Sequence, residues 1–263
     1  MAEYLPPAGS TCLVVGCNRG LGLEITKALA AGGVRTFGTS RRPCEELSAV
    51  GVGVIEAGID MEDEAAGAKI IAGLPEGSKV DTLMLVAGYF TTETIDELNF
   101  SEQRKMMEIC AFAPLRITQA LVAAGVLQAG AKIGMITSEG GSIGLRTEAE
   151  GGANYGHHMS KCAQNMMGKI LALDLKPKGI ALVMVHPGFL KTDMTAHYSH
   201  FYEEFGAMSP TEAVGPILMA VKKLDLNVGE PGRFIAPMGS RGLGLGVNAL
   251  PNSFLEDFGE LPW

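Results

Sequence analysis

Short apolar runs alternate along this chain with longer segments in which apolar residues recur at helical spacing. The short runs predict strands at 11–16, 34–39, 52–55, 80–86, 131–137, 180–186 and 232–236. The longer segments predict helices at about 20–32, 62–73, 101–124, 155–176 and 210–224. Strands that are regularly separated by helices form βαβ units, and right-handed crossovers then place helices on both faces of a parallel sheet. The pattern therefore predicts an α/β fold with a doubly wound parallel sheet.

No linker, repeat or low-complexity block interrupts this alternation, so we expect residues 1–263 to form a single domain. Apolar residues make up 47% of the chain and aromatic residues only 6%, a balance that suits strands buried on both faces. The net charge of −8 argues against nucleic acid or an anionic membrane surface as a partner. No apolar run approaches the roughly 20 residues of a membrane span, so we expect no membrane partner.

The five cysteines are odd in number and include no C-x-x-C pair, which indicates reduced thiols rather than a disulfide framework. The opening residues, MAEYLPP, resemble neither a signal peptide nor a transit peptide. Adjacent His157 and His158 point apart, and the pair His197 and His200 lacks a convincing third ligand. We therefore expect a cytoplasmic protein without a metal site.

A glycine-rich loop follows the first predicted strand and opens the first predicted helix. Its spacing, G-x-x-x-G-x-G, is a variant of the dinucleotide-binding fingerprint. Gly16 permits a sharp turn, Gly20 keeps side chains away from a diphosphate, and Gly22 lets the helix pack close to the sheet. The N-terminus of the helix then presents free N–H groups to the anion. The cofactor-binding candidates in this loop are Gly16, Asn18, Arg19, Gly20, Leu21 and Gly22.

The residues after the second predicted strand bear on the choice of dinucleotide. An acidic residue at this point would hold the ribose 2′-hydroxyl of NAD, whereas basic residues suit the 2′-phosphate of NADP. The chain has Ser40, Arg41 and Arg42 here, with no acidic residue, and Arg19 could close on the same phosphate. An ordinary solvated turn would also account for the two adjacent arginines. The absence of an acidic residue favours the 2′-phosphate over the 2′-hydroxyl. We therefore predict NADP(H) as the cofactor, with Ser40 and Arg41 among its contacts.

Ligands of parallel sheets collect at the carboxyl ends of the strands, so the residues after the other strands are also candidates. Asp60 could lie beside the adenine ring or cap a helix, and the two roles are compatible. Small residues after the fourth strand let the backbone approach a ribose, and the turn after the sixth strand could hold a nicotinamide carboxamide. The candidates at these strand ends are Asp60, Met61, Ala87, Gly88, Pro187, Gly188, Leu190 and Thr192.

Taken in order, these motifs resemble the short-chain dehydrogenase/reductase family over nearly the whole chain. The matching features are the glycine loop, Asp60, Ala87-Gly88, Gly141-Ser142-Ile143, Ser160-Lys161 and Pro187-Gly188-x-x-x-Thr192. The run from His186 to Met194 and the closing Gly-Glu-Leu-Pro-Trp look most like the C-factor/sniffer-type carbonyl reductases. The resemblance implies a Rossmann fold, an NADP(H) cofactor, and a homodimer or homotetramer built on the two central helices.

The resemblance also implies a catalytic set of Asn, Ser, Tyr and Lys. Lys161 stands where the family has the lysine that binds the nicotinamide ribose, and Ser138 where it has the serine that contacts the substrate oxygen. The tyrosine position, four residues before the lysine, holds His157, and the asparagine position holds Cys110. Tyr155 is a poor substitute, because it lies about 240° around a helix from Lys161. The expected catalytic residues are therefore Ser138, His157 and Lys161.

Two interpretations of His157 remain open. An imidazole has an unperturbed pKa near ~6.5 and can donate or accept a proton at neutral pH. Lys161 nearby would lower the pKa of His157 and keep the ring neutral, which makes it a base or a weak donor. In the other interpretation, His157 is a partly buried helix histidine in a protein that no longer performs this chemistry.

An aromatic cluster lies beyond the sixth predicted strand, within a segment at about 193–209. Its members are Tyr198, Phe201, Tyr202 and Phe205. The family carries a substrate-covering segment at this point, which implies an apolar or aromatic ligand. A hydrophobic face that closes the domain, or a contact with another subunit, would give the same spacing.

The sequence leads to one favoured function and two alternatives. The favoured one is an NADPH-dependent oxidoreductase of the short-chain dehydrogenase/reductase type that reduces a carbonyl of an apolar or aromatic small molecule. The loss of the tyrosine and the asparagine motivates a non-redox member that binds NADP(H) as a sensor, scaffold or assembly subunit. A third possibility is a cofactor-retaining isomerase or cyclase with His157 as its base.

Overall fold

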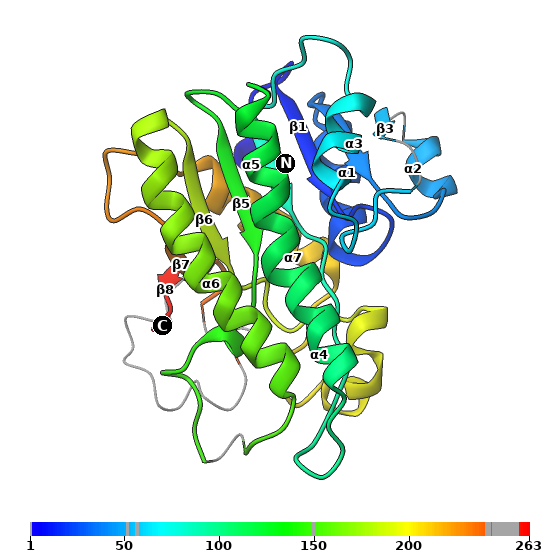
Figure 1. Ribbon diagram of the computed structural model, residues 1–263, viewed down its shortest axis with the longest axis vertical. Coiled ribbons are helices and arrows are strands. Elements are labelled where there is room, and N and C mark those ends of the chain that lie inside the picture. Colours follow the sequence, from blue (N-terminus) through cyan, green and yellow to red (C-terminus); the bar gives the residue numbers. More distant parts are fainter. Residues whose placement is uncertain (1, 51–52, 56–57, 149–150, 240–242, 244–257) are drawn as a thin grey trace.

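The computed structural model describes residues 2–50, 53–55, 58–148, 151–239, 243 and 258–263. Its strands form one eight-stranded sheet in the order β3-β2-β1-β4-β5-β6-β7-β8 (Figure 1). Every pair is parallel except β7 with β8. The strands are β1 (Thr11–Val15), β2 (Arg35–Thr39), β3 (Gly53–Ile55), β4 (Thr82–Leu85), β5 (Lys132–Ile136), β6 (Ala181–Val185), β7 (Arg233–Ala236) and β8 (Gly259–Glu260). The seven predicted strands are confirmed, and β8 is an addition.

The α-helices are α1 (Gly20–Ala31), α2 (Glu45–Ala49), α3 (Ala66–Gly73), α4 (Phe100–Met107), α5 (Ala113–Ala123), α6 (Tyr155–Leu175) and α7 (Pro210–Lys222). The short helix α2 is not predicted by the sequence pattern. The predicted helix at 62–73 begins only at Ala66, because the residues before it form turns closed by Asp60 and Asp63. Helices cover both faces of the sheet (Figure 1), which confirms the doubly wound α/β prediction.

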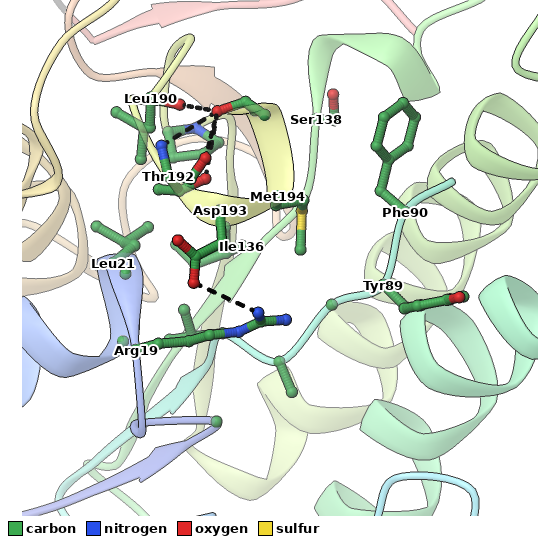
Figure 2. Close-up of a pocket in the computed structure, with 18 of the residues that line it drawn as sticks. Arg19, Leu21, Tyr89, Phe90, Ile136, Ser138, Leu190, Thr192, Asp193 and Met194 are labelled. Atoms are coloured by element: carbon green, nitrogen blue, oxygen red, sulfur yellow. Dashed lines mark hydrogen bonds and ion pairs between the residues drawn. The ribbon is translucent and has the colours of Figure 1, made fainter. Parts of the chain in front are cut away.

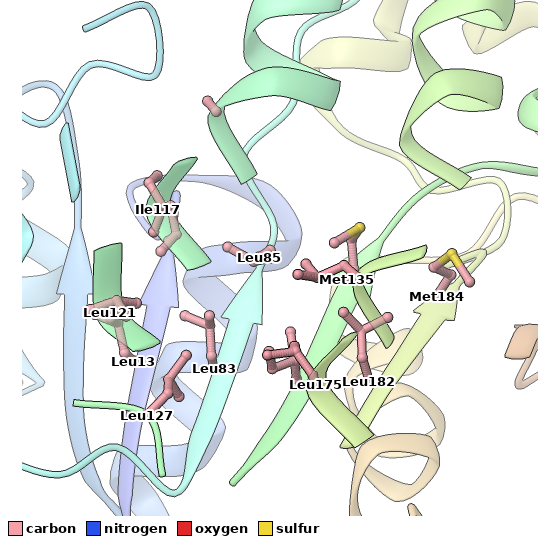
Figure 3. Close-up of a cluster of buried hydrophobic side chains, with 14 of the residues drawn as sticks. Leu13, Leu83, Leu85, Ile117, Leu121, Leu127, Met135, Leu175, Leu182 and Met184 are labelled. Atoms are coloured by element: carbon pink, nitrogen blue, oxygen red, sulfur yellow. The ribbon is translucent and has the colours of Figure 1, made fainter. Parts of the chain in front are cut away.

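Successive side chains of the inner strands are buried on opposite faces, as the period of a strand requires. Leu13 belongs to a cluster that the sheet shares with α3, α5 and α6, in which Ile117 and Leu121 of α5 take part (Figure 3). Cys12 and Val14 of the same strand belong to the opposite cluster, with α1 and α7. Both faces of the sheet are therefore shielded from water, which explains why its strands are mostly apolar in sequence.

The predicted helix at 101–124 is a continuous helical stretch, Phe100–Ala123, with a π-helical segment η2 (Glu108–Phe112) between α4 and α5. Pro114 follows the π segment and has no N–H to donate to the preceding turn, so the regular ladder is interrupted here. By length and composition this stretch could cross a membrane, but half of its most apolar window is buried inside the fold. A core helix of this kind passes the same test, so the stretch is weak support for a membrane span.

Residues 259–263 contact β7 and the loop that follows β5. β8 pairs antiparallel with β7, and the Leu261 N–H donates to the carbonyl of Phe234 at 2.7 Å. The Ser142 hydroxyl donates to the Pro262 carbonyl at 2.6 Å, and the Gly144 N–H donates to the Trp263 carbonyl at 2.8 Å. The closing residues thus tether the loop that begins at the end of β5.

The strand order reverses between β1 and β4, which are neighbours in the sheet but lead to connections on opposite sides. Such a switch point opens a crevice at the carboxyl ends of the strands, where open α/β sheets bind their ligands. The glycine loop after β1 and the Ala87-Gly88 pair after β4 border this crevice.

Candidate active site

A cleft of about 990 Å³ lies at the carboxyl ends of the strands. It is bordered by the segments that follow the six strands β1 to β6 and by the start of α6. It brings together all of the predicted site residues: Gly16, Asn18, Arg19, Gly20, Leu21, Gly22, Ser40, Arg41, Asp60, Met61, Ala87, Gly88, Ser138, His157, Lys161, Pro187, Gly188, Leu190 and Thr192.

The glycine loop forms the outer end of the cleft and leaves no room for side chains at its key positions. Gly16 has φ +89°, and a Cβ atom there would lie 2.7 Å from Ala87. A Cβ atom on Gly22 would lie 1.9 Å from the Gly16 carbonyl oxygen, so the helix packs directly on the loop. Arg19 precedes α1 without a side-chain cap, which leaves the first-turn N–H groups facing the cleft.

Three cationic side chains, those of Arg19, Arg41 and Arg42, line the cleft near the end of β2 and are exposed. Arg19 pairs with Asp193 at 3.6 Å (Figure 2), so the loop after β6 approaches the glycine loop. Ser40 is buried, and its hydroxyl donates to the Arg42 carbonyl at 2.6 Å, which fixes the turn that carries the arginines.

Two further predicted contacts carry structural roles as well as facing the cleft. Asp60 accepts a hydrogen bond from the Glu62 N–H at 3.0 Å, so it caps a turn rather than the helix α3. Thr192 begins the 3₁₀ helix η5 (Asp193–Phe201), and its hydroxyl lies 3.3 Å from that of Thr195. Because these hydrogen bonds already fix the two side chains, a ligand that contacts them would cost little further side-chain entropy.

Lys161 is buried at the inner end of the cleft, on α6 beside the end of β5. Its ammonium group donates to the Gln164 amide oxygen at 2.8 Å and to the Ile136 carbonyl at 3.4 Å. Gln164 also donates to the Ile136 carbonyl, at 3.2 Å, so the amide is held in place from two sides. An ammonium has three donors, and the third remains for a ligand in the cleft.

Ser138 stands at the end of β5 and lines the cleft. Its hydroxyl oxygen accepts a hydrogen bond from the Gly140 N–H at 3.0 Å, as the cap of η3 (Glu139–Gly141). The next N–H, that of Glu139, donates to Nδ1 of buried His186 at 3.1 Å. The turn therefore fixes the Ser138 oxygen while its own proton can be donated into the cleft.

His157 projects from α6 into the cleft, four residues before Lys161. Its ring packs edge-on against Phe90, with the ring centroids 4.8 Å apart. Desolvation, followed by the nearby charge of Lys161, lowers the pKa of His157 to about 3. The ring is therefore neutral at physiological pH, as the sequence predicts, and its Nδ1 atom is buried without a hydrogen-bond partner among the described residues.

The other two positions of interest do not face the cleft. Tyr155 is the first residue of α6, is 37% exposed and does not line the cleft, so it is a poor substitute for the missing tyrosine, as predicted. Cys110 is buried in η2, and its thiol lies 3.7 Å from the carbonyl oxygen of Tyr89. Its contact is thus with the chain behind the cleft wall.

Comparison with known proteins decides the family. The short chain dehydrogenase model matches residues 10–203. This chain belongs to that family. A 1-hydroxy-2-glutathionyl-2-methyl-3-butene dehydrogenase of Rhodococcus is 31% identical over 82% of this chain and 92% of its own length. The C-signal protein of Myxococcus xanthus is 35% identical over 38% of this chain and 58% of its own length.

A solved structure supports the same assignment of fold. The NADPH-bound carbonyl reductase from chicken fatty liver superposes with a TM-score of 0.75 and 25% sequence identity. The match covers 90% of this chain and 98% of the chicken chain. The fold of this short chain dehydrogenase is therefore shown over most of its length.

In this family member, the segment after β6 covers the inner cleft with aromatic side chains. Tyr198, Phe201 and Phe205 line the cleft, whereas the Tyr202 hydroxyl lies 3.0 Å from the Thr195 hydroxyl and its ring packs on Phe189. Three of the four predicted aromatic residues thus face the cleft, and Tyr202 instead contacts Thr195 and Phe189.

The cleft is also lined by residues that the sequence analysis did not predict. Phe90 points toward the Ser138 end of the cleft (Figure 2) and stacks on His197 with a centroid distance of 5.4 Å. Asn154 and His158 line the cleft at the start of α6. Phe90 could have been predicted from its position two residues after Gly88, after the fourth strand. Asn154 and His158 belong to no motif whose spacing would have identified them. The described residues contain no group of three or more His, Cys, Asp or Glu that could hold a metal ion.

Proposed function

We propose that this short chain dehydrogenase is an NADPH-dependent reductase of a carbonyl on an apolar or aromatic small molecule. The observation that carries the proposal is one continuous cleft with an anion-binding glycine loop and arginines at its outer end. At its inner end lie Ser138, His157 and Lys161, under an aromatic cover. The NADPH-bound chicken carbonyl reductase of the same fold supports this choice of cofactor.

The residues present fit the cofactor. The uncapped start of α1 and the tight Gly16–Gly22 loop suit a diphosphate, because larger side chains would collide with the chain itself. Arg41 and Arg42 supply positive charge for a 2′-phosphate, and the turn Ser40-Arg41-Arg42 that follows β2 contains no acidic residue. Arg19, which pairs with Asp193, adds a third positive charge. When bound, NADPH supplies the hydride for reduction of a carbonyl carbon.

The inner residues then act on the substrate and the ribose. The Ser138 hydroxyl donates to the carbonyl oxygen, and the free N–H of Lys161 binds ribose hydroxyls. His157 is neutral, so it orients the substrate oxygen as a weak hydrogen-bond donor. The proposed role of His157 in proton transfer is therefore limited to what a neutral imidazole can do.

Binding and turnover of nicotinamide cofactors test the proposal. We expect NADPH to bind tighter than NADH, measured by quenching of cofactor fluorescence, and R41A to weaken NADPH binding but leave NADH binding unchanged. We expect wild type to oxidise NADPH with members of a panel of aromatic ketones, aldehydes and diketones over multiple turnovers.

Two results would instead support the alternatives. Tight NADPH binding without oxidation, with turnover restored in H157Y, would identify a retained cofactor platform. Conversion of a substrate without any change in cofactor absorbance at 340 nm would identify an isomerase or cyclase that keeps its cofactor. The changed residues His157 and Cys110 motivate both alternatives.

A further inference from the structure

Reduction of a carbonyl needs a proton donor. The identity of that donor is inferred here, and the inference rests on the proposed reductase function. With a pKa of about 3, His157 carries its second proton in only about one molecule in 10⁴ at pH 7. Lys161 directs one of its donors to the Gln164 side chain on α6 and a second to the Ile136 carbonyl at the end of β5. The acid that serves the carbonyl oxygen must therefore come from elsewhere in the cleft.

Two of the chain's five tyrosines line the cleft in the described part of the structure, Tyr89 and Tyr198. Tyr89 points away from Ser138 (Figure 2), and its hydroxyl donates to the Glu102 carboxylate at 2.6 Å. This bond raises the pKa of Tyr89 and commits its proton to another acceptor. Tyr198 is then the phenol that remains for a substrate.

The hydrogen bonds of Asn154 decide whether the Tyr198 hydroxyl acts as an acceptor or as a donor toward this residue. The Asn154 amide oxygen accepts from the Glu93 N–H at 3.4 Å, so its NH₂ group faces Tyr198, and Nδ2 lies 3.0 Å from the phenolic oxygen. An amide NH₂ can only donate, so the phenolic oxygen is the acceptor in this bond. The O–H proton of Tyr198 is left for another acceptor, and the cleft supplies the space for one.

The position of Tyr198 places this proton at the inner end of the cleft. Asn154 directly precedes α6 and is three residues before His157. The ring of Phe90 lies 4.8 Å from that of His157 and 6.1 Å from that of Tyr198. The phenol of Tyr198 and the imidazole of His157 therefore flank the same aromatic side chain.

We propose that Tyr198, held by Asn154, is the catalytic acid that donates its proton to the substrate's carbonyl oxygen. The carbonyl carbon would take its hydride from a C–H bond of bound NADPH, which would leave NADP⁺, and the π electrons of the C=O bond would move to the oxygen. That oxygen takes the proton as the Tyr198 O–H bond breaks. The Asn154 N–H stabilises the phenolate that remains, and water at the open side of the cleft returns the proton. The segment after β6 thus supplies a phenol to the cleft, where position 157 of α6 holds a histidine instead of a tyrosine.

Paired tyrosine substitutions test the proposal, with Y202F as the matched control on the same segment. Y198F should lower kcat/KM for an aromatic ketone by ~10²–10⁴-fold, the usual loss for a positioned acid, while NADPH affinity stays within about twofold. Y202F should leave kcat/KM within about threefold, because Tyr202 does not line the cleft. N154G, which accepts the left-handed conformation of that residue (φ +51°), should cause a smaller loss because the phenol is still present.

An infrared measurement adds a readout that needs no turnover. A ¹³C=O-labelled aromatic ketone bound with NADP⁺ should show a lowered carbonyl stretch in wild type and Y202F, and a higher stretch in Y198F, where the hydrogen bond is lost. An unchanged stretch and rate in Y198F would overturn the proposal. A large loss of rate confined to H157Q would also overturn it, because it would assign the acid to His157.

The two proposals fail in different ways. If wild type oxidises no NADPH but Y198F still shifts the carbonyl stretch, the reductase function is wrong and Tyr198 remains the donor to the carbonyl. If wild type turns over and Y198F matches it, the reductase function stands and the role of Tyr198 is wrong.

Discussion

At the residue scale, the inner cleft is governed by a neutral imidazole placed near an ammonium group. His157 and Lys161 are four residues apart on α6, so both side chains reach the same cleft. Withdrawal from water and the positive neighbour act in the same direction on His157 and favour its uncharged form. The ammonium group at this site is therefore that of Lys161, whereas His157 contributes an uncharged polar ring.

This arrangement predicts a pH dependence of stability. The pKa of His157 is about 3 in the folded protein and near ~6.5 in the unfolded chain, so only the unfolded chain binds a proton between these values. The free energy of unfolding should therefore fall as the pH falls from about 6.5 toward 3. By urea unfolding of the cofactor-free protein, wild type should lose about 2 kcal/mol more than H157Q between pH 7 and pH 5.

The control for removal of a histidine is H200Q, because His200 is exposed on η5. H200Q should retain the wild-type difference between pH 7 and pH 5. Equal pH dependence of wild type and H157Q would show that the His157 ring is hydrated in solution.

At the scale of elements, the residues after β8 hold the loop that carries Ser138. Two hydrogen bonds join Pro262 and Trp263 to Ser142 and Gly144, a few residues beyond Ser138. The Trp263 ring also lies 5.8 Å from the ring of buried Phe234 in β7. These contacts connect one edge of the sheet to the end of β5 that lines the cleft.

Shortening this connection should affect both stability and catalysis. Deletion of Pro262 and Trp263 removes two hydrogen bonds and a ring contact, and should lower the free energy of unfolding by about 1–3 kcal/mol. Because the Ser138 loop loses its tether, kcat should fall while NADPH affinity at the glycine loop is retained. S142A removes the bond to Pro262 and also the bond that the Ser142 hydroxyl accepts from the Leu145 N–H, and should cost about 1–3 kcal/mol. A deletion variant with unchanged kcat and stability would contradict this role.

At the scale of the whole molecule, α6 and the neighbouring helical stretch Phe100–Ala123 pack together (Figure 1). Both also present apolar side chains to solvent. The exposed members are Phe112, Leu115, Met159, Met166, Ile170 and Leu173. On α6, Met159, Met166, Ile170 and Leu173 follow a spacing that keeps them on one helix face. We propose that a second copy of this chain covers this surface through a two-fold, self-complementary contact.

Charge placed in this surface should separate the copies. The double substitution M166E/I170E should convert the oligomer to a monomer in light scattering after size-exclusion chromatography, because each copy would bury like charges opposite one another. V228E changes an exposed apolar residue that follows α7 and should leave the mass unchanged. A monomeric wild type, or an oligomer that survives the double substitution, would contradict the proposed contact.

Local periodicity and local chemistry were enough to determine much of this protein from its sequence. The apolar runs mark the seven parallel strands because most positions of a strand buried on both faces are apolar. The glycine spacing marks the cofactor end because only glycine fits where α1 packs on its own loop, as Gly16 and Gly22 show. The residues that follow the strands converge because carboxyl ends of parallel strands meet at one edge.

Tertiary structure alone decided the relations between segments that are far apart in the chain. Tyr198 meets Asn154 across 44 residues, and the closing residues meet Ser142 across 120 residues. The pKa of His157 depends on burial and on neighbours from several elements, so no spacing along α6 could give its value. Likewise β8, two residues long, forms because β7 offers an edge, and not because of its own sequence. These features depend on contacts that exist only after the sheet has assembled.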